Sequence, residues 1–154
     1  MLLAIDPGTT HSALVLYDAA VGLCAHYRTG NDWILSYLRQ YDAAPNDVLV
    51  IERVASYGMP VGDEVFETVR YAGRFEQEWV RRGLPCYRIT RADVKITICG
   101  QSRAKDGNVR QELINRFGGP QATKKGGPLY KVAGDSWQAL AVACAWADPN
   151  RPTR

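Results

Sequence analysis

The feature that most constrains the fold is a continuous apolar run over residues 48–51, Val-Leu-Val-Ile, which ends at the charged Glu52. A run without polar alternation is typical of a strand that is covered on both faces, as in a sheet between layers of helices. The chain opens on a similar run over residues 1–5, which ends at Asp6. The sequence therefore predicts an α/β fold in which two buried strands each end at a carboxylate.

The other segments complete a five-stranded mixed sheet flanked by helices. Two further strands follow the first by tight turns and predict an antiparallel meander, whereas apolar residues at helical spacing mark the helices. A chain of 154 residues is long enough for one well-buried domain, which we expect to cover residues 1–154. The expected strands are residues 1–5, 12–17, 21–30, 47–54 and 84–90, and the expected helices are residues 31–42, 62–83, 91–100, 102–119 and 134–148.

Two segments carry more specific expectations. Asn31 or Asp32 is the expected N-cap of the first helix, because both side chains can accept a hydrogen bond from a free backbone N–H. Residues 120–134 lack periodicity and are rich in Gly, Pro and Lys, which predicts a mobile basic loop before the last helix.

The helix over residues 62–83 has apolar side chains on two sides, so one side can face the sheet and the other a partner. The side expected to face the sheet carries Val65, Phe66, Val69, Ala72, Gly73 and Val80. The second stripe is formed by Tyr71, Phe75 and Trp79. Because an apolar patch of this kind is unusual on the surface of a monomer, the second stripe predicts a homodimer.

Charge distribution and cysteine content indicate the kind of partner and the cellular compartment. Residues 1–64 carry 3 Lys and Arg against 8 Asp and Glu, whereas residues 65–154 carry 16 against 8. The basic second part indicates a polyanionic partner such as nucleic acid, the alternative being an ordinary solvated face. The four cysteines form no Cys-x-x-Cys pair, which indicates reduced thiols in a cytosol. No segment approaches the roughly 20 apolar residues that span a bilayer, so we expect no membrane partner.

Three acidic residues stand where elements end or begin. Asp6 and Glu52 end strands, and Asp135 begins the last helix. If the two strands are parallel neighbours, the first two carboxylates emerge side by side at one edge, although Glu52 could also mark the point where its strand reaches solvent. Crowded carboxylates suit Mg²⁺ or Mn²⁺, and two such ions roughly 3.5–4 Å apart can activate a water for phosphodiester hydrolysis.

Four motifs in this order resemble the RuvC-type Holliday-junction resolvases of the RNase H-like superfamily, particularly small phage or prophage versions. They are AIDPGTTHSALVLYD, LVIERV, RADVKITICGQSRAKDGNVRQELI and DSWQALAVA, which together cover nearly the whole chain. The resemblance implies an RNase H-like fold and a cytoplasmic homodimer, in a bacterium or a phage-infected cell, that nicks four-way DNA junctions symmetrically. It also implies two Mg²⁺ or Mn²⁺ ions at Asp6, Glu52 and Asp135.

Two other functional interpretations remain open. The Asp-x-Gly-Thr-Thr pattern at Asp6 also opens the phosphate loop of actin-like ATPases and sugar kinases, but these enclose a nucleotide between two such domains. The second interpretation rests on Gln138, which stands where the family commonly has a further acid on the last helix. An amide oxygen coordinates a hard cation more weakly than a carboxylate does, so a catalytically weak protein that binds branched DNA is the alternative.

The resemblance also suggests residues near the scissile phosphate. Lys95 matches a position close to that phosphate, where a cation would stabilise developing charge, although it could also be a solvated helix lysine. Lys105 can reach the DNA backbone, whereas Asp106 is expected to be a helix N-cap. His11 follows Asp6 closely and either contacts phosphate or is satisfied within its turn.

The remaining expected DNA contacts come from loops and from basic residues. Relatives carry an aromatic wedge at the position of Ala55, so Tyr57 or Met59 would have to take that role unless both are ordinary loop residues. Contacts to the DNA backbone make binding depend steeply on salt. In addition to Lys105, they are expected from Arg103, Arg110, Arg116, Lys124, Lys125 and Lys131.

Overall fold

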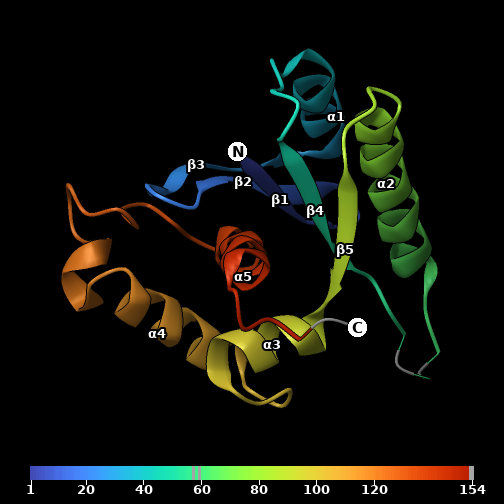
Figure 1. The fold of residues 1–154 in the computed structure, drawn as a ribbon. Coiled ribbons are helices and arrows are strands. Elements are labelled where there is room, and N and C mark those ends of the chain that lie inside the picture. Colours follow the sequence, from blue (N-terminus) through green and yellow to red (C-terminus); the bar gives the residue numbers. More distant parts are fainter. Residues whose placement is uncertain (57, 59, 153–154) are drawn as a thin grey trace.

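The two apolar runs lie side by side at the centre of a sheet. In the computed structural model, which describes residues 1–56, 58 and 60–152, β1 (Leu2–Asp6) is parallel to β4 (Val48–Arg53). β2 (His11–Asp18) pairs antiparallel with β1 and with β3 (Gly22–Gly30), and β5 (Cys86–Thr90) is parallel to β4. The strand order is β3-β2-β1-β4-β5, so the predicted five-stranded mixed sheet is confirmed (Figure 1).

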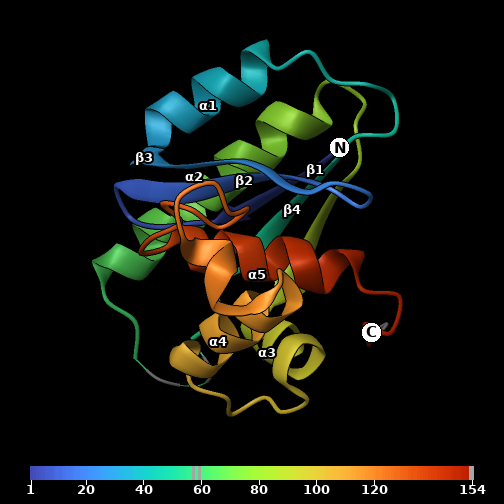
Figure 2. The same ribbon diagram turned by 90° about the vertical axis from the view of Figure 1, so that its left-hand side faces the viewer.

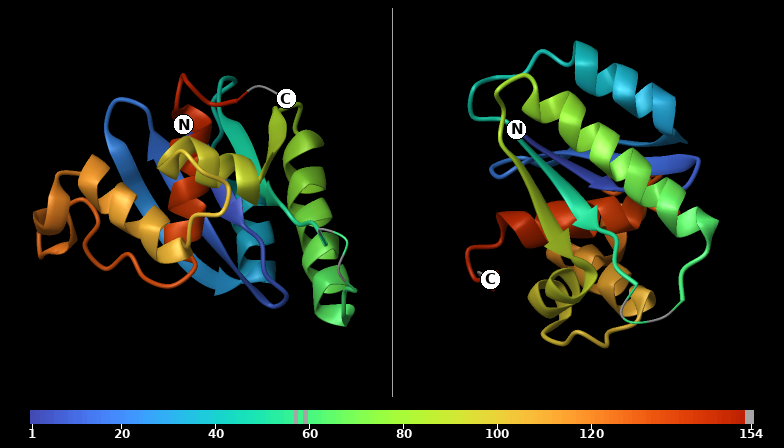
Figure 3. Two further views of the ribbon diagram at one scale, coloured as in Figure 1. Left: turned by 90° about the horizontal axis from the view of Figure 1, so that it is seen from below. Right: turned by 90° about the vertical axis from the view of Figure 1, so that its right-hand side faces the viewer.

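Helices cover both faces of this sheet. On one face, α1 (Asn31–Gln40) and α2 (Asp63–Val80) pack side by side (Figure 3). On the other face, α5 (Ser136–Ala147) crosses β1 and β2, with α3 (Arg91–Cys99) and α4 (Asp106–Arg116) packed beyond it (Figure 2). A short 3-10 helix, η1 (Gly119–Thr123), follows α4. The helices agree with the expected ones to within a few residues.

Side-chain alternation along β1 assigns its residues to the two faces. Leu3 and Ile5 are fully buried in the cluster that contains α1 and α2. Ala4 belongs instead to the cluster that contains α5, and its small side chain leaves room for the helix. Because successive residues of a strand point to opposite faces, Asp6 continues the α5 side. The same reasoning places Glu52 on that side, since Val50 packs in the α5 cluster.

The two apolar stripes of α2 are oriented opposite to the expectation. Phe75 and Trp79, assigned above to a partner, are fully buried in the protein's own core, and the Trp79 Nε1–H donates to the Pro85 carbonyl at 3.0 Å. Phe66 and Val69, assigned above to the sheet, are instead 62% and 48% exposed. Aromatic side chains remove more apolar surface from water than valines do, so the aromatic stripe packs inward.

The segment 120–134 is folded onto the protein and is not a free loop. Ala122, Leu129 and Val132 are buried in the cluster around α5, and the Leu129 N–H donates to the Ala122 carbonyl at 2.8 Å. A side chain at Gly127 would lie 2.3 Å from that same carbonyl oxygen, so the turn requires glycine. Apolar anchors spaced irregularly along the segment therefore fix a turn that periodicity does not reveal.

Two further expectations concern the chain's chemistry. Cys24, Cys86, Cys99 and Cys144 are all free thiols. Among the residues that the structure describes, no helix is both long and apolar enough to cross a membrane.

Candidate active site

The three candidate carboxylates are brought to one edge of the sheet by strand register and by the start of α5. Asp6 and Glu52 directly follow Ile5 and Ile51, which are paired across β1 and β4. Asp135 is the residue before α5, the helix that packs on β1 and β2. The pKa of Asp6 is raised to about 8, first by burial and then by the nearby charge of Glu52, with a smaller contribution from Asp135. The negative charges of all three therefore act on the same region.

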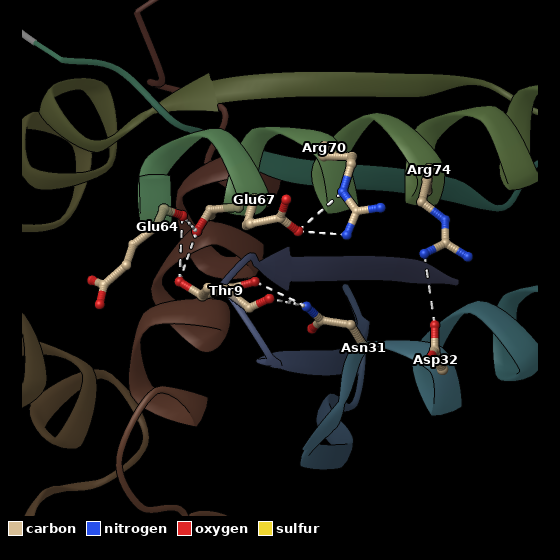
Figure 4. Close-up of polar contacts among 9 residues, drawn as sticks. Thr9, Asn31, Asp32, Glu64, Glu67, Arg70 and Arg74 are labelled. Atoms are coloured by element: carbon tan, nitrogen blue, oxygen red, sulfur yellow. Dashed lines mark hydrogen bonds and ion pairs between the residues drawn. The ribbon is translucent and has the colours of Figure 1, made fainter. Parts of the chain in front are cut away.

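The turn after Asp6 is held by a buried polar network. The Gly8 N–H donates to Ser12 Oγ at 3.0 Å, and Ser12 Oγ donates to Asn31 Oδ1 at 2.6 Å. The Asn31 amide in turn donates to the Gly8 and Thr9 carbonyls at 3.0 and 3.1 Å (Figure 4). A Cβ at Gly8 would lie 2.2 Å from the His11 carbonyl oxygen, so no larger residue fits. This network fixes the backbone on which the Asp6 carboxylate stands.

The same network corrects the expected N-cap of α1. The cap is Gly30, and Asn31 is buried within the first turn, where its side chain bonds to the Gly8 turn and not to the helix. Thr9 extends the network to α2, because its hydroxyl lies 3.2 Å from Thr68 Oγ1 (Figure 4). His11 is exposed and its Nδ1 lies 3.0 Å from the Thr10 hydroxyl, which agrees with a histidine satisfied in its turn.

Arg91 and Lys95 surround Glu52 with positive charge. Arg91 Nη1 lies 2.9 Å from Glu52 Oε2, and Arg91 Nη2 lies 2.9 Å from Asp106 Oδ1. Burial raises the pKa of Glu52, and Arg91 partly opposes this. Lys95 Nζ lies 3.2 Å from Asp106 Oδ1 with only 18% of its side chain exposed, so Lys95 belongs to this network and is not a freely solvated lysine.

Asp106 is not the N-cap that the sequence suggested. The cap of α4 is Lys105, whose side chain makes no capping bond, and Asp106 lies in the first turn. Although burial acts in the opposite direction, Arg91 and Lys95 keep the pKa of Asp106 below its usual value. Asp106 therefore stays ionised and forms an ion pair with both Arg91 and Lys95.

On the other side of Asp6, Asp135 and Gln138 face different surroundings. The Arg28 Nε–H donates to Asp135 Oδ2 at 2.7 Å, and both side chains are about half exposed. Gln138 Oε1 is buried and accepts no hydrogen bond among the described residues. A buried oxygen without a donor is costly unless something else satisfies it, and a cation is one such partner.

The donor types near Asp6 suit a divalent cation, but in the part of the chain that the structure describes their side chains are not gathered into a coordination site. Among the described residues, no three His, Cys, Asp or Glu side chains are gathered closely enough to hold a metal ion. Glu52 and Asp135 each pair with an arginine through one carboxylate oxygen, and that arginine competes with a cation for the carboxylate. Three hard carboxylates, together with the unbonded oxygen of Gln138, match the oxygen ligands that Mg²⁺ and Mn²⁺ prefer. The pKa of Asp6 is raised first by burial and then by Glu52, so its ionised form is disfavoured in this protein.

The expected DNA-contacting residues divide into exposed and occupied groups. Arg116 is occupied, because it binds Asp148 at 3.2 Å and donates to two carbonyls of α3. Tyr57 and Met59 lie outside the described residues. The exposed basic residues follow α3, lie on α4 or belong to the segment before α5, on the α5 side of the sheet (Figure 2). They are Arg103, Lys105, Arg110, Lys124, Lys125 and Lys131.

Sequence reasoning missed two arginines that the structure places at the site, Arg28 and Arg91. Arg28 lies on the strand 21–30 two residues after His26, so strand alternation alone could have placed the two on one face. Arg91 directly follows β5, the strand beside β4, and the end of that strand lies at the same edge as Glu52. Neither signal identifies the carboxylate that each arginine binds.

Solved structures share this fold over most of its length. Thermus thermophilus RuvC matches with a TM-score of 0.66 at 17% sequence identity, covering 94% of this chain and 91% of that one. T. thermophilus RuvC in complex with Holliday junction substrate matches with a TM-score of 0.67 at 16% sequence identity, covering 94% of this chain and 90% of that one. No protein-family model matches the sequence, and no curated protein matches it. The fold is therefore that of RuvC.

Proposed function

We propose that this chain is a divalent-metal-dependent endonuclease that nicks four-way DNA junctions. The observation that carries the proposal is that Asp6, Glu52 and Asp135 stand at one edge of a RuvC fold, where burial, and after it the charges of Glu52 and Asp135, raise the pKa of Asp6 to about 8. A buried carboxylate beside other acids is typical of sites that bind cations. The solved RuvC complex with a Holliday junction supports the choice of substrate.

In this proposal, Asp6, Glu52 and Asp135 hold Mg²⁺ or Mn²⁺, with Gln138 as an additional oxygen ligand. Two bound cations would supply an activated water and stabilisation of the leaving 3′ oxygen. Asp6 must lose its proton when it becomes a ligand, so cation binding releases a proton near neutral pH. Lys95 and Arg91 would stabilise the negative charge of the phosphate from the Glu52 side.

Branched DNA is the proposed partner, bound through the exposed basic residues on the α5 side of the sheet. These residues supply backbone contacts without reading sequence, as recognition of a branched structure requires. Arg110 is held in place by the Trp137 ring, whose centroid lies 5.0 Å from the guanidinium carbon. Affinity for a junction should therefore fall steeply as salt rises.

A homodimer is proposed on the exposed stripe of α2. Phe66, Val69 and Val80 are 62%, 48% and 47% exposed, and all three lie on one side of the helix. A second copy would cover this stripe and would place two sites in a symmetric pair. Sedimentation tests the proposal: Phe66→Glu should yield a monomer while wild type is a dimer. A wild-type monomer at micromolar concentration would rule the dimer out.

The decisive experiment is cleavage of a labelled four-way junction in the presence of Mg²⁺. Wild type should introduce paired nicks, and Asp6→Asn, Glu52→Gln and Asp135→Asn should each lower the rate by about 100-fold or more because a metal ligand is lost. Asp32→Asn is the matched control, since Asp32 is 81% exposed beside α2 on the other face. Equal rates for Asp6→Asn and Asp32→Asn would refute the nuclease proposal.

Gln138 favours a second candidate, a protein that binds branched DNA but cleaves it weakly. Gln138 presents a neutral amide where the resolvases that this sequence resembles commonly have an acid, so a cation would be held by fewer carboxylates. Tight junction binding without metal, combined with negligible turnover by wild type, would favour this candidate. Multiple turnovers at low protein concentration would exclude it.

A further inference from the structure

A hollow of about 420 Å³ lies beside Asp135. Its walls come from β3 and from the segment that leads into α5. The lining residues are His26, Arg28, Lys131, Ala133, Gly134, Asp135 and Ser136. The hollow is thus open to solvent and continuous with one of the candidate metal ligands.

Basic side chains from two elements meet at this hollow. His26 and Arg28 stand opposite Val15 and Ala13, which pack in the α5 cluster, so both point toward the α5 side of the sheet. Lys131 approaches from the opposite wall and has a left-handed backbone, with φ of 66°, in the turn before α5. Arg28 lies along the Gly134 backbone, where a Cβ would be 3.6 Å from its Cδ.

The ion pair of Arg28 is more exposed and has fewer contacts than the ion pairs of Arg91. The side chains of Arg28 and Asp135 are 55% and 48% exposed, and the pair makes a single contact of 2.7 Å. Arg91 is only 22% exposed and binds both Glu52 and Asp106. Exposed ion pairs contribute little to stability and exchange partners readily, whereas a guanidinium binds phosphate through two parallel hydrogen bonds. Of the two arginines, Arg28 can therefore more easily exchange its carboxylate partner for a phosphate group.

We propose that this hollow binds a phosphodiester group of a DNA strand, and that Arg28 moves from Asp135 to that phosphate. The exchange frees the Asp135 carboxylate to bind a divalent cation. The inference rests on the proposed function and deepens it, because DNA binding then prepares the metal site. In the DNA-free protein the same arginine keeps one ligand occupied.

The test uses full-length protein, a four-way junction and EDTA, so that no cleavage occurs. Arg28→Gln should weaken junction binding by about 5- to 10-fold and lower the magnitude of the salt slope by about 1, because one phosphate contact is lost. The matched control is Arg88→Gln on the opposite edge strand, β5. Arg88 is 52% exposed and pairs with Glu76 on the other face of the sheet, so this variant should bind the junction as wild type does.

The exchange itself is tested by a double-mutant cycle with Asp135→Asn. If Arg28 must leave Asp135 to reach the phosphate, Arg28→Gln costs more junction affinity in the Asp135→Asn background than in wild type, because there Arg28 is already free. We expect a several-fold excess. Strictly multiplicative losses would show that the two side chains act independently and would overturn the exchange.

Metal binding without DNA gives an independent measurement. By calorimetry, Arg28→Gln should bind Mn²⁺ several-fold more tightly than wild type, since Asp135 has lost its competing partner, and Arg88→Gln should not differ. A merely structural role for Arg28 would weaken both DNA and Mn²⁺ binding. If wild type binds no junction, the proposed function fails; if wild type binds and Arg28→Gln equals Arg88→Gln, this inference alone fails.

Discussion

The two faces of the central sheet differ in the size and charge of the side chains that the same strands contribute to them. On the α1–α2 face, β1 contributes Leu3 and Ile5, which pack with large side chains such as Phe75 and Trp79. On the α5 face the same strand contributes a small residue, Ala4, and then Asp6. The large side chains on the α1–α2 face supply much of the core. On the α5 face, the small Ala4 allows α5 to pack close to β1, and the strand ends at Asp6.

The electrostatics of the two faces differ in the same way. On the α1–α2 face, Arg39 lies 2.7 Å from Glu78 and lowers the pKa of that carboxyl. On the α5 face, burial and neighbouring acids raise the pKa of Asp6. An ionised Glu78 therefore stabilises the folded state, whereas an ionised Asp6 destabilises it. Functional sites commonly retain such unfavourable groups, at a cost in stability that other regions offset.

The largest expected effect comes from removing bulk on the α1–α2 face. Trp79→Ala should lower the free energy of unfolding by about 3–5 kcal/mol, because Trp79 is fully buried and its indole N–H would lose the Pro85 carbonyl. Urea denaturation measures the change. Trp33→Ala, at a tryptophan that is 44% exposed on the same face, should cost much less. Similar losses for both would mean that this face is not the principal core.

The next effect comes from adding bulk on the α5 face. Ala143→Leu should destabilise the protein by about 1–3 kcal/mol, because Ala143 is fully buried on the helix that packs against the sheet. Ala147→Leu, at the exposed end of the same helix, should change stability by no more than about 0.5 kcal/mol. A neutral or stabilising Ala143→Leu would show that the small residues do not set the helix-to-sheet distance.

A pH series compares the acids directly in metal-free protein. Because the pKa of Asp6 is raised from 3.8 to about 8 on folding, protonation of Asp6 contributes stability that is fully present below about pH 4 and is lost progressively as the pH rises toward about 8. Asp6→Asn should therefore gain stability relative to wild type progressively across this range. Thermal melts in EDTA at several pH values measure the difference. Parallel curves for the two proteins would show that Asp6 is ordinarily solvated.

The smallest effect is expected at Gln138. Gln138→Asp should tighten Mn²⁺ binding by several-fold, because a charged oxygen replaces an amide oxygen that lacks a donor. The same change at the exposed Gln111 on α4 is the control and should leave Mn²⁺ affinity unaltered. If Gln138→Asp does not differ from Gln111→Asp in calorimetry, position 138 does not contact the cation.

Several parts of this arrangement follow from local sequence. The unbroken apolar runs before Asp6 and Glu52 identify two central strands, since only a strand covered twice tolerates such a run. Strand ends then position the acids without further information. The last helix is equally clear, because it is apolar on nearly all sides and must be buried.

Other parts depend on contacts that local patterns do not encode. Both stripes of α2 are apolar, so periodicity identifies the helix but not which stripe faces the sheet. The pair between Arg28 and Asp135 joins residues 107 positions apart, and the pair between Arg91 and Glu52 joins residues 39 positions apart. Ion pairs at such separations depend on the completed fold, so the sequence indicates the acidic residues but not the arginines that pair with them.

The tight turn at Gly8 offers a way to change the position of Asp6 without changing its side chain. Because an added methyl group would meet the His11 carbonyl oxygen at 2.2 Å, Gly8→Ala must push the turn aside while leaving every titratable group intact. Position 8 therefore allows the geometry of the candidate active site to be changed without changing its charges. A small shift of Asp6 could be imposed in this way and its effect on activity measured while Asp6, Glu52 and Asp135 all keep their side chains.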